Sequence, residues 1–232
     1  MKKVLTFLIT SSTISVYGQV ELKQNPTDFI PKNYVIFEKT IGDLNKDGLE
    51  DQILIIKGTD TNQIITDKYR GRLDRNRRGI IVLFNKGGHY ELAVENHDCF
   101  SSENEPGGVY FAPELSIGIN KGNFYVHYYH GRYGNWQYTF GFRNSDFELI
   151  SYESTYRSSF EPNHGANHDI AFDEKYVDLL NKKKIVKELV KVNPEGEETI
   201  KETLDDIIVY RLIKLSEIID FDDLRLRSTY RE

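Results

Sequence analysis

One short segment, DLNKDGLED at residues 43–51, constrains the fold of this 232-residue chain more than any other. Oxygen-bearing side chains stand at positions 1, 3, 5 and 9 of the segment, and Gly48 at position 6 permits a sharp bend. Ca²⁺ takes six to eight oxygen ligands, and loops with this spacing supply them from alternate side chains and a backbone carbonyl. The sequence therefore predicts a calcium site made by Asp43, Asn45, Asp47, the backbone carbonyl of Leu49, and Asp51.

The residues on either side of this segment favour strands rather than helices. A calcium loop between two helices requires a bidentate Glu at position 12, and this chain has Leu54 there. The flanking runs 34–41 and 52–57 are rich in β-branched and aromatic residues. We therefore expect a β-hairpin with the ion at its turn. The alternative is a plain hairpin turn at Asp47-Gly48 that binds no metal.

Most of the remaining chain also has the pattern of strands. Alternating apolar and polar residues end at turns of Gly, Asn and Asp, as in antiparallel sheets. Ser216 is expected to cap a short helical turn that reaches Phe221. The fold class predicted is mainly β, an antiparallel β-sandwich or a strongly folded meander. Strands are expected at 79–85, 90–95, 114–120, 123–130, 135–143, 147–153, 169–172, 176–180, 185–192 and 207–215.

The first residues have the pattern of a secretory signal peptide. Lys2 and Lys3 precede an apolar, hydroxyl-rich stretch, and small residues precede Gln19, so residues 1–18 are expected to be removed. An uncleaved anchor helix is the alternative. Elsewhere the sequence has no run near the ~20 apolar residues that a membrane span requires. We therefore expect an exported protein, periplasmic or secreted, with a polar arm at 19–33, a β core at 34–154, and a further β layer of the same domain at 155–232.

Composition narrows the partners. A net charge of −6 argues against a nucleic-acid partner, which requires a basic face, and favours a protein or glycan of the cell envelope. Cys99 is the single cysteine, so the chain forms no internal disulfide. It stands next to His97 and Asp98, but adjacent residues in a strand point apart, so we interpret it as an inert thiol.

Two further segments are candidates for recognition. The hairpin tip HGRYGNW offers His130, Arg132, Tyr133 and Trp136 to a partner; alternatively, it is a simple connection with Trp136 in the core. A basic cluster in a long charged stretch at 59–78 is either a solvated loop or a docking site for an acidic partner. Its members are Arg70, Arg72, Arg75, Arg77 and Arg78.

The motifs resemble those of known groups. GDLNKDGLEDQILI at 42–55 resembles the calcium loops of FG-GAP and VCBS-type repeats. Together with ELAVENHDCF and the aromatic strands, covering roughly 34–152, it resembles uncharacterised exported bacterial β proteins. The order His130-Gly131-Arg132-Tyr133 is distantly similar to the inhibitory loop of periplasmic lysozyme inhibitors, although His replaces the Ser of that motif and the spacing to Tyr is one residue shorter.

The resemblance implies a non-catalytic binding or inhibitory module, against a muramidase or an envelope glycan. An Arg-bearing loop could occupy a cleft that carries two catalytic carboxylates. Two alternatives stay open, a hydrolase or lyase of envelope polysaccharide and a calcium-stabilised structural scaffold.

Overall fold

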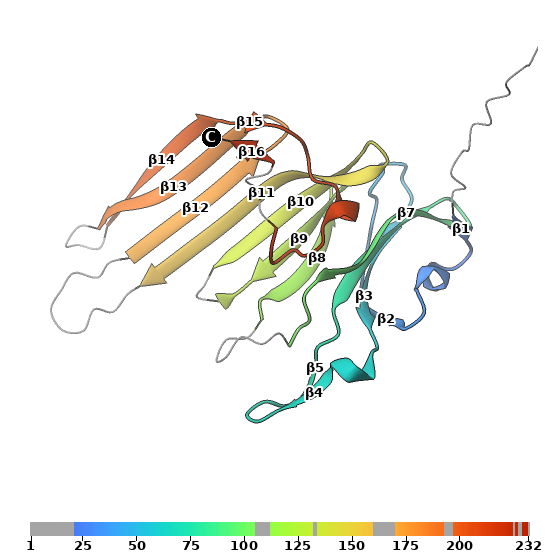
Figure 1. Ribbon diagram of the computed structural model, residues 1–232. Coiled ribbons are helices and arrows are strands. Elements are labelled where there is room, and N and C mark those ends of the chain that lie inside the picture. The colour runs from blue at the N-terminus through green and yellow to red at the C-terminus, as the bar shows by residue number, and fades with distance from the viewer. Residues whose placement is uncertain are drawn as a thin grey trace, which may run out of the picture.

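The computed structural model shows two large antiparallel β-sheets that pack face to face (Figure 1), and two small two-stranded sheets. It describes residues 21–104, 112–131, 134–159, 170–192, 197–224, 226 and 229–231. The mainly β, sandwich-like fold expected from the sequence is confirmed. The proposed signal peptide at 1–18 lies outside the described residues.

The first sheet has five strands in the order β1-β7-β6-β3-β2, and the second has seven in the order β14-β13-β12-β11-β10-β9-β8. The first consists of β1 (Leu22–Lys23), β2 (Tyr34–Gly42), β3 (Asp51–Gly58), β6 (Arg78–Asn85) and β7 (Tyr90–Phe100). The second consists of β8 (Glu114–Asn120), β9 (Asn123–Tyr129), β10 (Asn135–Arg143), β11 (Asp146–Ser159), β12 (Ile170–Asp178), β13 (Lys183–Val192) and β14 (Glu198–Asp206).

The two central strands of the first sheet are buried on both faces. Alternate residues of a strand point to opposite sides, so one run of Ile, Leu and Val supplies two cores. Ile53 and Val82 face the main core between the sheets, while Leu54 and Leu83 face a smaller outer cluster. This continuous apolar run explains why the β3 and β6 strands were predictable from the sequence.

Aromatic rings fill the main core. Phe124 and Phe140 stack with centroids 4.9 Å apart, and Phe147 contacts Phe124 at 5.1 Å. The edges of the two sheets meet on one side, where the Thr40 hydroxyl of β2 donates to the Ile117 carbonyl of β8 over 3.2 Å. The core is therefore enclosed by a sheet pair that is joined at this edge and open at the other, where β12 to β14 extend away (Figure 1).

Two segments that the sequence predicted to be irregular, 19–33 and 59–78, contain regular structure beside the first sheet. In the predicted arm, β1 pairs with β7, and the 3-10 turn η1 (Pro26–Phe29) buries Phe29 in the outer cluster. The charged stretch at 59–78 is a 3-10 turn, η2 (Thr61–Gln63), followed by a projecting hairpin of β4 (Ile64–Asp67) and β5 (Gly71–Asp74). These strands are four residues long and largely polar, so they carry little periodic signal.

The C-terminal part corrects the sequence prediction. The strand expected at 207–215 is wrong: only β15 (Ile208–Val209) is a strand there, and it pairs with β16 (Tyr230–Arg231). The apolar residues of this run instead cross over the core, where Ile207, Ile213 and Leu215 are buried. The edge of the second sheet is instead formed by β14, which is charged and exposed. Charged side chains are common on edge strands, and without a buried face the strand has no apolar pattern by which to predict it.

The helical turn expected near the C-terminus is present as a 3-10 turn, η4 (Leu215–Glu217), but Ser216 does not cap it. Lys214 stands at the N-cap position, and the Ser216 hydroxyl instead donates to the carboxylate of Asp146. The two strands expected at 169–172 and 176–180 are the single strand β12. In the described part of the chain, no helix has the length and apolar character needed to cross a membrane.

Candidate functional site

The predicted calcium loop connects β2 to β3 and is tightly wound around the side chain of Asp43. One carboxylate oxygen of Asp43 accepts the backbone N–H groups of Lys46 (2.6 Å) and Asp47 (3.2 Å), and the other accepts that of Gly48 (3.0 Å). Gly48 has φ +85°, which glycine adopts without strain. The bend that the sequence predicted at Gly48 is therefore present.

Asn45 and Asp47 form the outer part of the loop. The Asp47 carboxylate accepts the Leu49 N–H at 2.8 Å and the Asn45 amide at 2.8 Å. The hydrogen bond from the Leu49 backbone, followed by that from Asn45, holds the pKa of Asp47 below its usual range. Asp47 is therefore ionised at neutral pH, as a calcium ligand must be.

Asp51 fixes the inner end of the loop. Its side chain is fully buried, and its two oxygens accept the N–H groups of Leu44 (2.8 Å) and Asn85 (2.9 Å). Burial raises the pKa of Asp51, although the backbone hydrogen bonds oppose that shift. Because Asn85 ends β6, the Asp51 carboxylate joins the loop to the neighbouring strand.

The donor set of the loop fits Ca²⁺ in its chemistry. Asp43, Asn45, Asp47 and Asp51 carry oxygen donors, the ligand type that Ca²⁺ prefers, and a carboxylate that accepts one or two N–H groups keeps further lone pairs. In this structure the carboxylates of Asp43, Asp47 and Asp51 all point toward N–H groups of the chain rather than toward one common point. Across the described ranges, no three His, Cys, Asp or Glu side chains form a group that could hold a metal ion.

The predicted recognition tip is partly described. His130 follows β9, half-buried, and its N–H donates to the Gly134 carbonyl at 2.9 Å. Trp136 is half-buried against the main core and stacks on Tyr128 at 5.3 Å with an interplanar angle of 17°. Arg132 and Tyr133 lie outside the described residues. Trp136 thus contributes to packing, whatever the tip binds.

The five arginines of the basic cluster do not form one patch. Arg78 is 4% exposed, its Nε donates to the Ser101 carbonyl at 3.0 Å, and its guanidinium lies over the Phe37 ring. Arg77 pairs with Asp220 at 2.9 Å. Arg70 and Arg75 both bond to Asn104, and Arg72 is exposed on β5. Arg77 and Arg78 are thus engaged within the fold, while Arg70 and Arg75 meet at Asn104, and docking of an acidic partner stays a prediction.

Cys99 is buried in the main core, where burial raises the pKa of its thiol well above the usual range. A thiol of this kind stays protonated and is a poor nucleophile.

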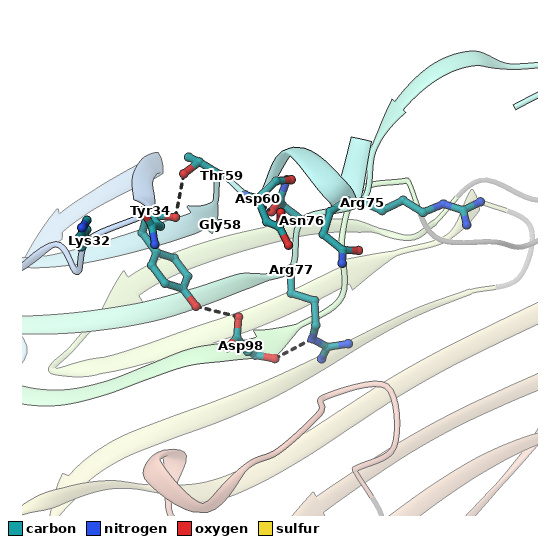
Figure 2. Close-up of a pocket in the computed structure, with 11 residues that line it drawn as sticks. Lys32, Tyr34, Gly58, Thr59, Asp60, Arg75, Asn76, Arg77 and Asp98 are labelled. Atoms are coloured by element: carbon teal, nitrogen blue, oxygen red, sulfur yellow. Dashed lines mark hydrogen bonds between the residues drawn. The ribbon is translucent and has the colours of Figure 1, made fainter. Parts of the chain in front are cut away.

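A pocket of about 470 Å³ lies at the opposite end of the β2–β3 hairpin from the calcium loop (Figure 2). It could not be predicted from the sequence, because its wall comes from four separated segments. They are the entry to β2 (Lys32, Asn33, Tyr34), the end of β3 and η2 (Gly58, Thr59, Asp60, Gln63), the entry to β6 (Arg75, Asn76, Arg77) and Asp98 of β7.

Two hydrogen-bonded groups define this pocket. The Tyr34 hydroxyl donates to Asp98 at 3.0 Å, and burial followed by this bond raises the pKa of Tyr34 to about 12 (Figure 2). Asn76 is 3% exposed: its amide oxygen accepts the Asp60 N–H, and its NH₂ donates to the Asp60 carbonyl and to Asp74. These bonds hold the floor and one wall of the pocket in place.

A scan against protein-family models, a search of curated proteins and a search of solved structures each found no match. The resemblance to FG-GAP loops and lysozyme inhibitors therefore stays a prediction.

Proposed function

We propose that this protein is an exported, calcium-binding β protein that acts as a non-catalytic binding or inhibitory module on a protein or glycan of the cell envelope. The observation that carries the proposal is the loop at 43–51. Three carboxylates, Asp43, Asp47 and Asp51, stand in this one segment at the end of the β2–β3 hairpin, and Asp51 is fully buried. Like charges so close in the sequence repel each other, and a divalent cation offsets that repulsion.

The residues that would hold Ca²⁺ are Asp43, Asn45, Asp47, the backbone carbonyl of Leu49, and Asp51. Bound there, the ion would supply positive charge and rigid coordination rather than any reaction step. Burial has raised the pKa of Asp51, so its ionised form is disfavoured in the folded chain without a cation. A cation at the loop would favour that ionised form and stabilise the folded state.

The carboxylates of the pocket support a binding role. Here one oxygen of Asp60 accepts the N–H and the amide of Asn62, and one oxygen of Asp98 accepts the Tyr34 hydroxyl. In each carboxylate one oxygen thus holds the pocket's own structure, and the other is left to accept a hydrogen bond from a ligand.

Thermal unfolding in Ca²⁺ and in chelator tests the calcium part of the proposal. An ion that binds the folded state stabilises it by about 2.7 kcal/mol at a concentration 100 times its Kd. The Tm of the chain that begins at Gln19 should therefore rise with Ca²⁺ and fall with chelator, and Asp47→Ala should abolish the response.

Asp67→Ala is the matched control. Asp67, the half-buried last residue of β4, is also a carboxylate before a turn that accepts two backbone N–H groups, from Tyr69 and Arg70, both at 2.8 Å. This variant should lower the Tm slightly and keep the full calcium response. If the Tm of the unchanged chain does not depend on Ca²⁺, the loop is a plain turn and the calcium proposal is withdrawn.

Sedimentation with isolated peptidoglycan and inhibition of a purified muramidase test the binding part. Binding or inhibition by the intact chain supports the proposal. Release of reducing sugar from the peptidoglycan would instead favour the hydrolase alternative.

A further inference from the structure

The pocket between β2, β3, β6 and β7 has a surplus of hydrogen-bonding groups that the fold does not use. The side-chain amides of Asn33 and Gln63 make no hydrogen bond to the described part of the chain, and neither does the ammonium of Lys32. One oxygen of Asp60 and one of Asp98 are likewise left without a described donor. Donors and acceptors therefore line the same space.

The charges of the pocket oppose a strongly anionic ligand. Asp60 and Asp98 both line it, and Arg77 is already engaged, because its Nε donates to the Asp98 carbonyl at 2.9 Å and its terminal nitrogen pairs with Asp220. The Arg75 side chain extends away from Asp60 and Asp98 (Figure 2), and its Nε donates to the Asn104 carbonyl at 3.2 Å. A phosphate or a polyuronate would thus meet two carboxylates and one uncommitted cation, Lys32.

An aromatic ring completes the wall. Tyr34 is half-buried, packs against the outer apolar cluster, and lies 5.6 Å from the ring of His97. Its position is fixed by the bond to Asp98, so the ring is preorganised rather than mobile. A fixed aromatic surface beside amides and carboxylates suits a ligand with apolar C–H faces and many hydroxyls, since each hydroxyl both donates and accepts.

We propose that this pocket binds a neutral saccharide. The volume of about 470 Å³ lies within the range of small-molecule sites, about 300–1,000 Å³. Vicinal hydroxyls would donate to the free oxygens of Asp60 and Asp98 and accept from Gln63 and Asn33. The inference rests on the proposed binding function and names the ligand class and the site through which it acts.

Titration of ¹⁵N-labelled protein with the N-acetylglucosamine tetramer, and separately with maltotetraose, tests the proposal. These neutral oligosaccharides distinguish an envelope amino sugar from hexoses in general. Saturable shifts of the Asn33 and Gln63 side-chain amides and of the Asn76 backbone amide are expected with at least one of them. Polygalacturonate, an anionic polymer, should bind at least tenfold more weakly.

Two variants connect the binding to the pocket. Asp98→Asn keeps the shape but replaces an acceptor by a donor, and Gln63→Ala removes an exposed amide, so both should fold. Each should weaken the oligosaccharide affinity about tenfold, the effect of ~1.4 kcal/mol. Asp173→Asn, which changes an exposed carboxylate of β12, is the matched control and should leave the affinity unchanged.

The outcomes separate this inference from the proposed function. If neither sugar shifts the pocket resonances at ~10 mM, or if the pocket variants bind as the unchanged chain does, the saccharide site is refuted. Binding of the intact chain to peptidoglycan together with an unresponsive pocket would refute the inference alone. The absence of any envelope binding would refute the proposed function as well.

Discussion

Asp51 should be the most sensitive residue of the calcium loop, even when no calcium is present. Replacement by Ala leaves the N–H groups of Leu44 and Asn85 without the acceptors that they have at 2.8 and 2.9 Å. Each polar group that is buried without a partner costs about 1–3 kcal/mol. Because Leu44 is buried and Asn85 is only half-buried, the first donor should cost the full amount and the second less, so we expect Asp51→Ala to lower the free energy of unfolding by about 1–4 kcal/mol.

Urea unfolding at pH 7 in chelator measures this change in the free energy of unfolding. The variant Asp51→Asn separates the contributions of the two hydrogen bonds. Asn keeps the volume and one acceptor oxygen, so one of the two N–H groups retains its partner and the loss should be about half that of the Ala variant. Asp47→Ala, at an exposed position, should cost less than ~1 kcal/mol under the same conditions. A loss below ~1 kcal/mol for Asp51→Ala would show that its two hydrogen bonds do not hold the loop to β6.

Two further predictions concern export and the hairpin tip. Mass spectrometry of exported protein should find an N-terminus at or near Gln19; intact Met1 on protein recovered only from the cytoplasm would contradict export. Replacing Arg132 and Tyr133 together by Ala should weaken inhibition of a muramidase, with a change in stability below ~0.5 kcal/mol. A fall of several degrees in Tm without any change in inhibition would remove the tip from the recognition surface.

The sequence predicted those strands whose pattern follows from burial. β3 and β6 are buried on both faces and read as unbroken apolar runs, whereas β9 alternates, with Phe124, Val126 and Tyr128 in the core. The same rule failed at 207–215, because an extended segment that crosses a core needs buried residues as much as a strand does. β14 was not predicted for the opposite reason: it is an edge strand exposed to solvent, so it has no buried apolar face and no apolar alternation in its sequence.

The candidate sites divide in the same way. The loop at 43–51 and its bend at Gly48 could be predicted because the residues are neighbours in the sequence, whereas the binding of calcium there stays a prediction. The pocket could not, because Tyr34 and Asp98 are 64 residues apart and are brought together only by the order β7-β6-β3-β2. Nothing in the pattern around Asp98 distinguishes it from an ordinary exposed strand residue. A site of this kind requires the topology before its chemistry can be recognised.

The positions of the loop and the pocket determine how closely calcium and ligand binding can be linked. Both lie on the β2–β3 hairpin, but Gly42 pairs with Asp51 at the loop, and Tyr34 pairs with Gly58 at the pocket. At about 3.4 Å per residue, the two ends are about 27 Å apart. β3 is held between β2 and β6 along its length, so the described structure offers no second arrangement of the hairpin that both sites could bias.

Calcium should therefore raise the stability of the chain while leaving the affinity of the pocket nearly unchanged. By the reciprocity of linked equilibria, saccharide should not change the affinity for calcium either. A partner that a chelator releases would consequently be bound at or near the loop, and one that persists in chelator would be bound elsewhere.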